Sequence, residues 1–168
     1  MKKILPLLII AAGLYGCSSG GSSSPPPSSS DPVPVPPPTN TANEIEPNNS
    51  TTLANPVTLV DNAIILRGSV DSDFFNSGLY DNKDYFSFAL STDATVTLSL
   101  ANADPLTQDI DIYVLDQNGT DYASDTSHGT PPLLSNVKLA AGVIWYVEVK
   151  AYLTDTTTSY ALTITPSP

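Results

Sequence analysis

The chain contains very little cysteine, histidine and positive charge: one cysteine, one histidine and six basic residues among 168. A single cysteine excludes a disulfide within the chain, and one cysteine with one histidine cannot supply the ligands of a zinc site. The histidine, His128, lies in a Ser-His-Gly-Thr-Pro loop with no nucleophile motif beside it. We therefore expect a surface loop residue and not the general base of a hydrolase.

The scarcity of basic residues also excludes partners that need clustered positive charge. The net charge is −11, and Arg67, Lys83, Lys138 and Lys150 stand singly along the chain. Nucleic-acid backbones require grouped Lys and Arg, and the chain has no Gly-rich phosphate loop for a nucleotide. Fourteen of the 17 acidic residues are aspartates. Aspartate suits both turns and calcium sites, so composition alone leaves a calcium site and solvated loops as alternatives.

The N-terminal residues have the pattern of a cleaved export signal. Two lysines precede an apolar run, residues 4–14, that is too short to span a bilayer. The run leads into Leu-Tyr-Gly-Cys, which resembles the signal of bacterial lipoproteins. The resemblance implies removal of residues 1–16, a diacylglyceryl anchor on Cys17 and, because Ser18 stands in place of an aspartate, delivery to the outer membrane. An ordinary secretory signal with an unmodified cysteine is the alternative.

A stalk is predicted after the signal. Residues 18–43 are rich in Ser, Gly, Pro and Thr and contain almost no large apolar side chain. Such a segment cannot bury a core, so we predict a disordered stalk over residues 17–43 that starts at the lipidated Cys17. Its prolines favour extended polyproline II, which would hold a folded domain clear of the lipid surface. A proline-rich ligand for another domain is the alternative interpretation.

Residues 44–168 have the pattern of one domain of ordinary size in which apolar residues recur with period two. The alternation places Val96, Leu98 and Leu100 on one face of a strand and hydroxyl groups on the other. We expect an all-β antiparallel sandwich of jelly-roll or Greek-key type with about eight strands. The predicted strands cover residues 63–70, 84–90, 95–100, 110–114, 122–123, 133–139, 143–152 and 159–165.

Several segments of this domain, in their order and spacing, resemble the bacterial pre-peptidase C-terminal domain family. They are residues 43–50 (NEIEPNNS), 65–70 (ILRGSV), 84–88 (DYFSF), 109–116 (DIDIYVLD), 141–147 (AGVIWYV) and 160–164 (YALTI). The resemblance spans nearly all of residues 44–165. It implies a β-sandwich without catalytic residues, of a kind usually appended to secreted peptidases, some members of which bind calcium or matrix polymers.

The same resemblance implies a calcium site. In calcium-binding members, the acidic opening motif and the loop before the Asp-aromatic strand meet at the metal, which takes six to eight oxygen ligands. Asn49 stands where such members often carry an acid, so the expected site has one charge fewer. The residues implicated by position are Glu44, Glu46, Asn48, Asp81 and Asp84.

The loop of residues 71–80 is unusually apolar for a loop. Phe74, Phe75 and Tyr80 are candidate ligand-binding residues that could stack on sugar rings or contact a protein partner. The alternative is that these aromatic side chains fold back and cover one end of the sandwich. The sequence alone does not choose between the two.

Two acids on one predicted strand raise the question of catalysis. Asp109 and Asp111 are two residues apart, about 6.6 Å along a strand, which is near the separation used by inverting glycosidases. Those acids must flank a cleft from opposite sides, so we expect Asp109 and Asp111 to be solvated acids that face outward.

We predict a non-catalytic envelope lipoprotein, held to a membrane by its lipid, that binds or displays extracellular protein or polysaccharide. A small polysaccharide hydrolase and a purely structural envelope assembly partner are the alternatives.

Overall fold

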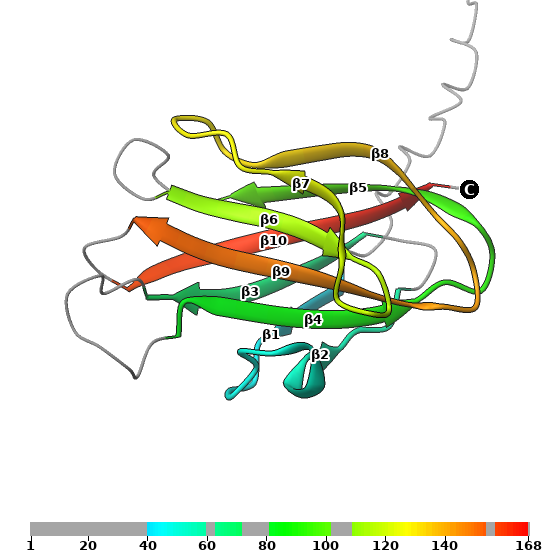
Figure 1. Cartoon of the computed structure of the whole chain (residues 1–168), viewed down its shortest axis with the longest axis horizontal. Helices are drawn as coiled ribbons and strands as arrows, with labels where there is room; N and C mark the ends of the chain where they lie inside the picture. The colour runs from blue at the N-terminus through cyan, green and yellow to red at the C-terminus, as the bar shows by residue number, and fades with distance from the viewer. Residues whose placement is uncertain (1–39, 60–62, 72–80, 102–108, 154–156, 168) are drawn as a thin grey trace, which may run out of the picture. The chain divides into compact units, whose positions relative to one another are not determined.

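Strands form where apolar and polar residues alternate, because that pattern gives each strand one face for the core and one for water. The computed structural model describes residues 40–59, 63–71, 81–101, 109–153 and 157–167. Its strands form two sheets of five that pack face to face (Figure 1). The described residues contain no α-helix, and their one short 3-10 helix is η1 (Thr51–Leu53).

Successive strands alternate between the two sheets along the chain, except that β6 and β7 are neighbours in one sheet. The first sheet has the order β1 (Asn40–Asn43), β3 (Ile64–Val70), β10 (Thr158–Ser167), β5 (Ala94–Ala101) and β8 (Leu133–Leu139). The second has the order β2 (Asn55–Pro56), β4 (Lys83–Ala89), β9 (Ile144–Leu153), β6 (Asp109–Leu115) and β7 (Asp121–Asp125).

The eight strands β3 to β10 have the connectivity of a jelly roll. Strands β3, β10, β5 and β8 pair antiparallel in one sheet, and β4, β9, β6 and β7 pair antiparallel in the other. The prediction of an all-β jelly-roll sandwich is therefore confirmed, and the predicted strands coincide with β3 to β10 to within a few residues.

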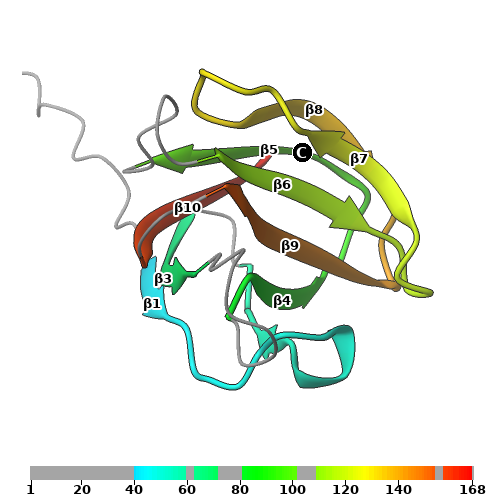
Figure 2. The same ribbon diagram turned by 60° about the vertical axis from the view of Figure 1, so that its left-hand side comes forward.

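Two additional strands at one edge of the sandwich were not predicted. β1 pairs in parallel with β3, and β2 pairs in parallel with β4, so the N-terminal segment adds one strand to each sheet (Figure 2). The assignment of residues 40–43 to a disordered stalk was wrong, because these residues form β1. All four of their side chains are exposed. They carry no apolar alternation, and they join the sheet through backbone pairing with β3.

The core lies between the sheets and consists of the residues predicted to face inward. Leu162 and Ile164 of β10, the central strand of the first sheet, are fully buried. They pack in one cluster with Phe86, Val147 and Val149 of the second sheet. Trp145, the only tryptophan, closes one end of this cluster. Its ring nitrogen donates a hydrogen bond of 3.0 Å to the carbonyl oxygen of Ala140, which satisfies its polar group.

We expect Leu162→Ala to lower the free energy of unfolding by about 2–5 kcal/mol, because it removes a fully buried side chain and leaves a cavity. Leu133→Ala is the matched control, since Leu133 of β8 is exposed and its loss should change stability by less than about 0.5 kcal/mol. Urea unfolding of the full-length chain measures both. Equal effects of the two substitutions would contradict the placement of the core.

Candidate metal centre

The period-two alternation that builds the core also places a carboxylate inside it. Asp84 of β4 has the same orientation as Phe86 and Phe88, so it points between the sheets, and it is fully buried. On the facing sheet, Gly68 of β3 and Tyr160 of β10 lie opposite each other in register. A buried charge is expensive unless polar groups surround it. The polar groups around Asp84 come from the N-terminal segment and from Tyr160.

Glu44 continues the path of β1 and reaches over Gly68. Its backbone N–H donates to the carbonyl of Arg67 at 2.9 Å, and its carboxylate accepts from the backbone N–H of Ser69 at 2.8 Å. A Cβ atom added at Gly68 would collide with Glu44 Oε2 and with the hydroxyl of Tyr160. Only glycine at this position leaves room for both groups.

The Tyr160 hydroxyl connects the buried Asp84 with the half-buried Glu44. It donates to Asp84 Oδ2 at 2.5 Å and lies 3.3 Å from Glu44 Oε2. Carboxylate oxygens of Glu44, Glu46 and Asp84 all lie within 4.8 Å of one another. Three acids from two separate segments of the chain therefore meet where the sandwich interior opens to solvent, with Asp84 buried, Glu44 half-buried and Glu46 exposed.

Amide oxygens complete this cluster. The side-chain oxygen of the fully buried Asn48 lies 3.0 Å from Glu46 Oε1 and 3.1 Å from Asp84 Oδ1. The side-chain oxygen of Asn49 lies 2.9 Å from Asp81 Oδ1 and 3.2 Å from Glu46 Oε2. We call these six residues the oxygen cage: Glu44, Glu46, Asn48, Asn49, Asp81 and Asp84.

Oxygen atoms at these separations repel one another unless something positive lies between them. Besides protons on the acids themselves, two arrangements supply it. A half-turn of the Asn48 amide would direct its NH₂ group at Glu46 and Asp84, and the same turn at Asn49 would direct its NH₂ group at Asp81. Alternatively, a cation bound among the oxygens would hold both amides in the orientation observed. The carboxylates and amides present are the hard oxygen ligands that calcium takes, so the cage fits that ion.

Burial and the neighbouring acids raise the pKa of two acids in the cage. Burial, and then the charge of Glu46, raise the pKa of Asp81 from 3.8 to about 7. Burial, and then its contact with Glu44, raise the pKa of Asp84 from 3.8 to about 10, although the Tyr160 hydroxyl opposes this shift. Without a cation, the cage therefore retains protons that ordinary aspartates release near pH 4.

The N-terminal segment is fastened to the sandwich on either side of the cage. The backbone N–H of Tyr85 donates to the carbonyl of Asn48 at 3.0 Å. The side chain of Asn55 exchanges two hydrogen bonds, of 2.7 and 2.8 Å, with the backbone of Ile45. The cage is thus the junction at which residues 44–55 cross from the first sheet to the second.

The structure brings together all five residues that the sequence implicated: Glu44, Glu46, Asn48, Asp81 and Asp84. It adds Asn49, Gly68 and Tyr160. Tyr160 lies on the strand predicted over residues 159–165, and the alternation of that strand did not indicate a role for its hydroxyl group. Gly68 carried a signal that was not used, since a glycine at an inward position of a strand marks a close approach by another group.

The other candidate residues lie elsewhere. Phe74, Phe75 and Tyr80 fall outside the described residues, as do Cys17 and the predicted signal. The expectation that Asp111 is a solvated acid was wrong, because its side chain is buried and accepts a hydrogen bond of 3.1 Å from the Tyr113 hydroxyl. Burial also raises the pKa of Asp111. Asp109 lies 3.5 Å from His128, which is exposed as predicted.

The jelly-roll connectivity places this chain among small all-β sandwich modules. Residues 82–151 match the family model described as the bacterial pre-peptidase C-terminal domain. The predicted resemblance to this family is thus confirmed over that range, which contains Asp84 but begins after Glu44, Glu46, Asn48 and Asp81.

A solved structure that is similar to this chain shows the same fold. The pre-peptidase C-terminal domain of a collagenase from Bacillus anthracis is 18% identical, with a TM-score of 0.50 over 66% of this chain and 93% of that domain. PliG from Aeromonas hydrophila, a periplasmic inhibitor of g-type lysozyme, is 10% identical, with a TM-score of 0.47 over 77% of this chain and 100% of PliG. No curated protein matches the chain.

Within the described residues, no helix has the length and apolar character needed to cross a membrane.

We expect Tyr160→Phe to lower the free energy of unfolding by about 1–3 kcal/mol in metal-free buffer, because the buried Asp84 then loses its hydroxyl donor. Tyr152→Phe is the control, since the side chain of Tyr152 is 60% exposed. Thermal unfolding of both variants beside the parent chain measures the difference. A Tyr160→Phe variant as stable as the parent would show that this hydrogen bond contributes nothing.

The raised pKa values predict an unusual dependence of stability on pH. Between pH 4 and pH 7 the metal-free native state binds more protons at Asp81 and Asp84 than the unfolded chain does, so stability must fall as pH rises. We expect the thermal midpoint in chelator to decrease from pH 5 to pH 8, and Asp84→Asn to reduce that decrease. A midpoint that rises over this interval would show that the cage carboxylates are ionised without a metal.

Proposed function

We propose that this chain is a non-catalytic, lipid-anchored module of the bacterial cell envelope, in which calcium stabilises a β-sandwich that binds or displays extracellular protein or polysaccharide. The calcium assignment rests on the meeting of Glu44, Glu46 and Asp84, whose carboxylate oxygens lie within 4.8 Å of one another, beside the buried Asn48. Glu44, Glu46, Asn48, Asp81 and Asp84 are the proposed ligands, with Asn49 beside them.

Calcium would have a mechanical consequence here, because the ligands come from separate parts of the fold. Glu46 and Asn48 belong to the N-terminal segment, whereas Asp84 belongs to β4 of the second sheet. Glu44 also contacts Ser69 and Tyr160 of the first sheet. A bound cation neutralises the repulsion among the acids, and these residues then hold the N-terminal segment, β1 included, firmly against both sheets.

The envelope location is proposed from the sequence and the family. The Leu-Tyr-Gly-Cys motif supports lipidation at Cys17, and Ser18 supports the outer membrane. The matched family takes its name from bacterial peptidases, which supports a place outside the cytoplasm. A non-catalytic role agrees with the contacts of the two acids considered for hydrolysis. The Tyr113 hydroxyl donates a hydrogen bond to Asp111, and His128 lies 3.5 Å from Asp109. Lack of turnover by the parent chain on a polysaccharide panel would exclude the hydrolase.

Calcium binding is tested by calorimetry of the full-length chain with calcium and with chelator. We expect calcium to raise the thermal midpoint and to bind one ion per chain. Asp84→Asn should weaken calcium binding at least about tenfold, since it removes a charged ligand, yet it should leave the metal-free chain at least as stable as the parent. Asp121→Asn is the control, because Asp121 is an exposed acid of β7 and should not change either quantity.

The opposite results would overturn the assignment. If calcium neither binds nor shifts the midpoint, the Asn48 and Asn49 amides satisfy the cage with their NH₂ groups and no metal is needed. If calcium binds equally well to the parent and to Asp84→Asn, the ion occupies another acidic part of the chain.

A further inference from the structure

A second site lies at the opposite edge of the sandwich from the oxygen cage. There, a depression of about 510 Å³ opens between the two sheets. Its lining combines the aromatic residues Tyr122 and Trp145, the charged residues Asp93 and Lys138, and the apolar Leu139 and Ala140. The volume falls within the range of roughly 300–1,000 Å³ that is usual for small-ligand sites. Neither the matched family nor the calcium site accounts for it.

Tyr122 owes its position in the depression to a β-bulge. In the pairing of β6 with β7, Val114 faces Ala123 and Leu115 faces Asp121, so Tyr122 has no counterpart. A bulge redirects the side chain of the extra residue, and here the Tyr122 ring lies 4.9 Å from the Trp145 ring at an interplanar angle of 60°. The Tyr122 hydroxyl donates to the carbonyl of Lys138 on the other sheet at 2.8 Å.

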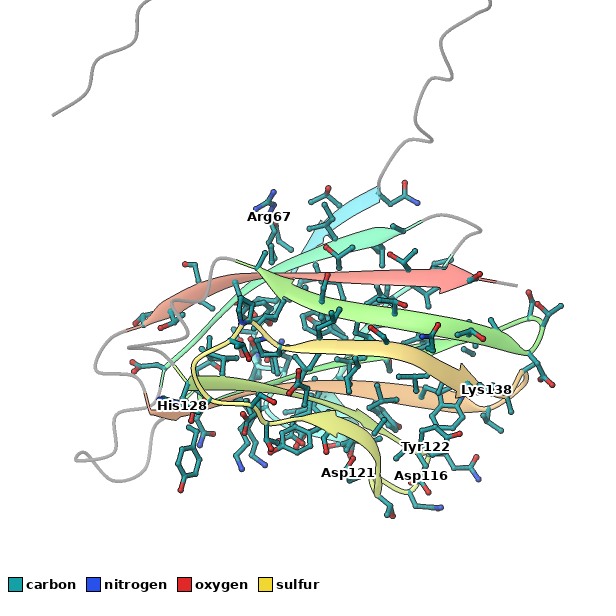
Figure 3. The ribbon with its side chains drawn as sticks, turned by 90° about the horizontal axis from the view of Figure 1, so that it is seen from above. Arg67, Asp116, Asp121, Tyr122, His128 and Lys138 are labelled. Carbon is teal, nitrogen blue, oxygen red and sulfur yellow. The ribbon has the colours of Figure 1, made fainter. Side chains whose placement is uncertain are left out.

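These contacts fix the ring without burying it. Tyr122 remains 52% exposed although its hydroxyl donates a hydrogen bond and its ring contacts the Trp145 ring. Figure 3 shows Tyr122 and Lys138 close together at this end of the molecule. A large aromatic surface that is exposed and held rigid loses little conformational entropy when a ligand binds. The structure therefore presents a preorganised stacking surface.

We infer that this depression binds a neutral saccharide, with one face of the sugar ring on Tyr122 and its hydroxyl groups at Asp93 and Lys138. The face of an aromatic ring carries partial negative charge and attracts the C–H groups that line one face of a sugar. A carboxylate and an ammonium group at the rim supply one hydrogen-bond acceptor and one donor for hydroxyl groups. Asp93 is held in place by the N–H of Ala141, which donates to it at 2.8 Å.

Charge and hydrogen bonding favour a neutral sugar over other ligands. The chain carries a net charge of −11, which repels anionic polymers. A proline-rich peptide needs hydrogen-bond donors on the aromatic side chains for its carbonyl groups. The Trp145 N–H and the Tyr122 hydroxyl already donate to carbonyl groups within the protein. A peptide that adds a strand needs a regular edge. Both neighbouring edges are bulged, at Tyr122 in β7 and at Asn136, with φ of 59°, in β8.

This inference deepens the proposed binding role and rests on it, but it is independent of the calcium site. Trp145 is the only tryptophan in the chain, so its fluorescence reports directly on the depression. We would titrate the full-length chain with neutral cello-, xylo-, manno-, malto- and chito-oligosaccharides. We expect a saturable change in Trp145 emission with at least one of them.

Tyr122→Ala should weaken that binding at least about tenfold, because it removes the stacking surface. Tyr152→Ala is the matched control: Tyr152 is also an exposed tyrosine but does not line the depression, and its loss should leave binding unchanged. Tyr122→Phe keeps the ring and should keep most of the affinity, which separates loss of stacking from loss of folding. Thermal unfolding of each variant confirms that it is folded.

The inference fails if no oligosaccharide changes the Trp145 emission, or if one binds and Tyr122→Ala binds it as tightly as the parent. If the parent binds no oligosaccharide but captures an envelope protein or a peptide, the saccharide assignment falls while the proposed binding role stands. If an oligosaccharide binds through Tyr122 but calcium does not bind, the saccharide site stands and the metal centre falls.

Discussion

The rest of the structure depends most on the oxygen cage, which forms around the buried Asp84 at one end of the sandwich. Asp84 points into the core because β4 alternates, and no choice of rotamer can bring it to the surface. Once a carboxylate is buried there, the surrounding chain must supply compensating groups. The Tyr160 hydroxyl supplies one of them, while Glu44 and Glu46 add further negative charge. We propose that a bound cation compensates this charge.

The buried cluster gives the N-terminal segment a structural role. β1 and β2 extend one edge of each sheet, yet neither has an apolar face that would hold it there. Between them, residues 44–55 are held by hydrogen bonds to Arg67, Ser69 and Tyr85. The chain thus enters the sandwich at the edge that contains the cage. The depression beside Tyr122 lies at the other edge, so a ligand there would not meet the entering segment.

The sandwich could be predicted from the sequence because its strands alternate strictly. Val96, Leu98 and Leu100, or Tyr160, Leu162 and Ile164, leave one arrangement of each strand that buries the apolar side chains. β1 could not be predicted in this way, since Asn-Thr-Ala-Asn has no apolar face and is held by backbone pairing.

The two sites were predictable to different degrees. Five of the six cage residues were implicated by their resemblance to a family motif. The burial of Asp84 could also have been inferred from the alternation, because Asp84 stands two residues before the inward-facing Phe86. The depression carried no comparable signal. Tyr122 reaches it through a bulge, and a bulge breaks the alternation on which the prediction of side-chain direction depends.

The orientation of the Asn48 amide tests the central claim most directly. A high-resolution crystal structure of the chain grown with calcium would reveal it together with any bound ion. Our account predicts a calcium ion coordinated by the side-chain oxygens of Glu46, Asn48 and Asp84. An Asn48 NH₂ group turned toward Glu46 and Asp84, with no ion among the carboxylates, would contradict it.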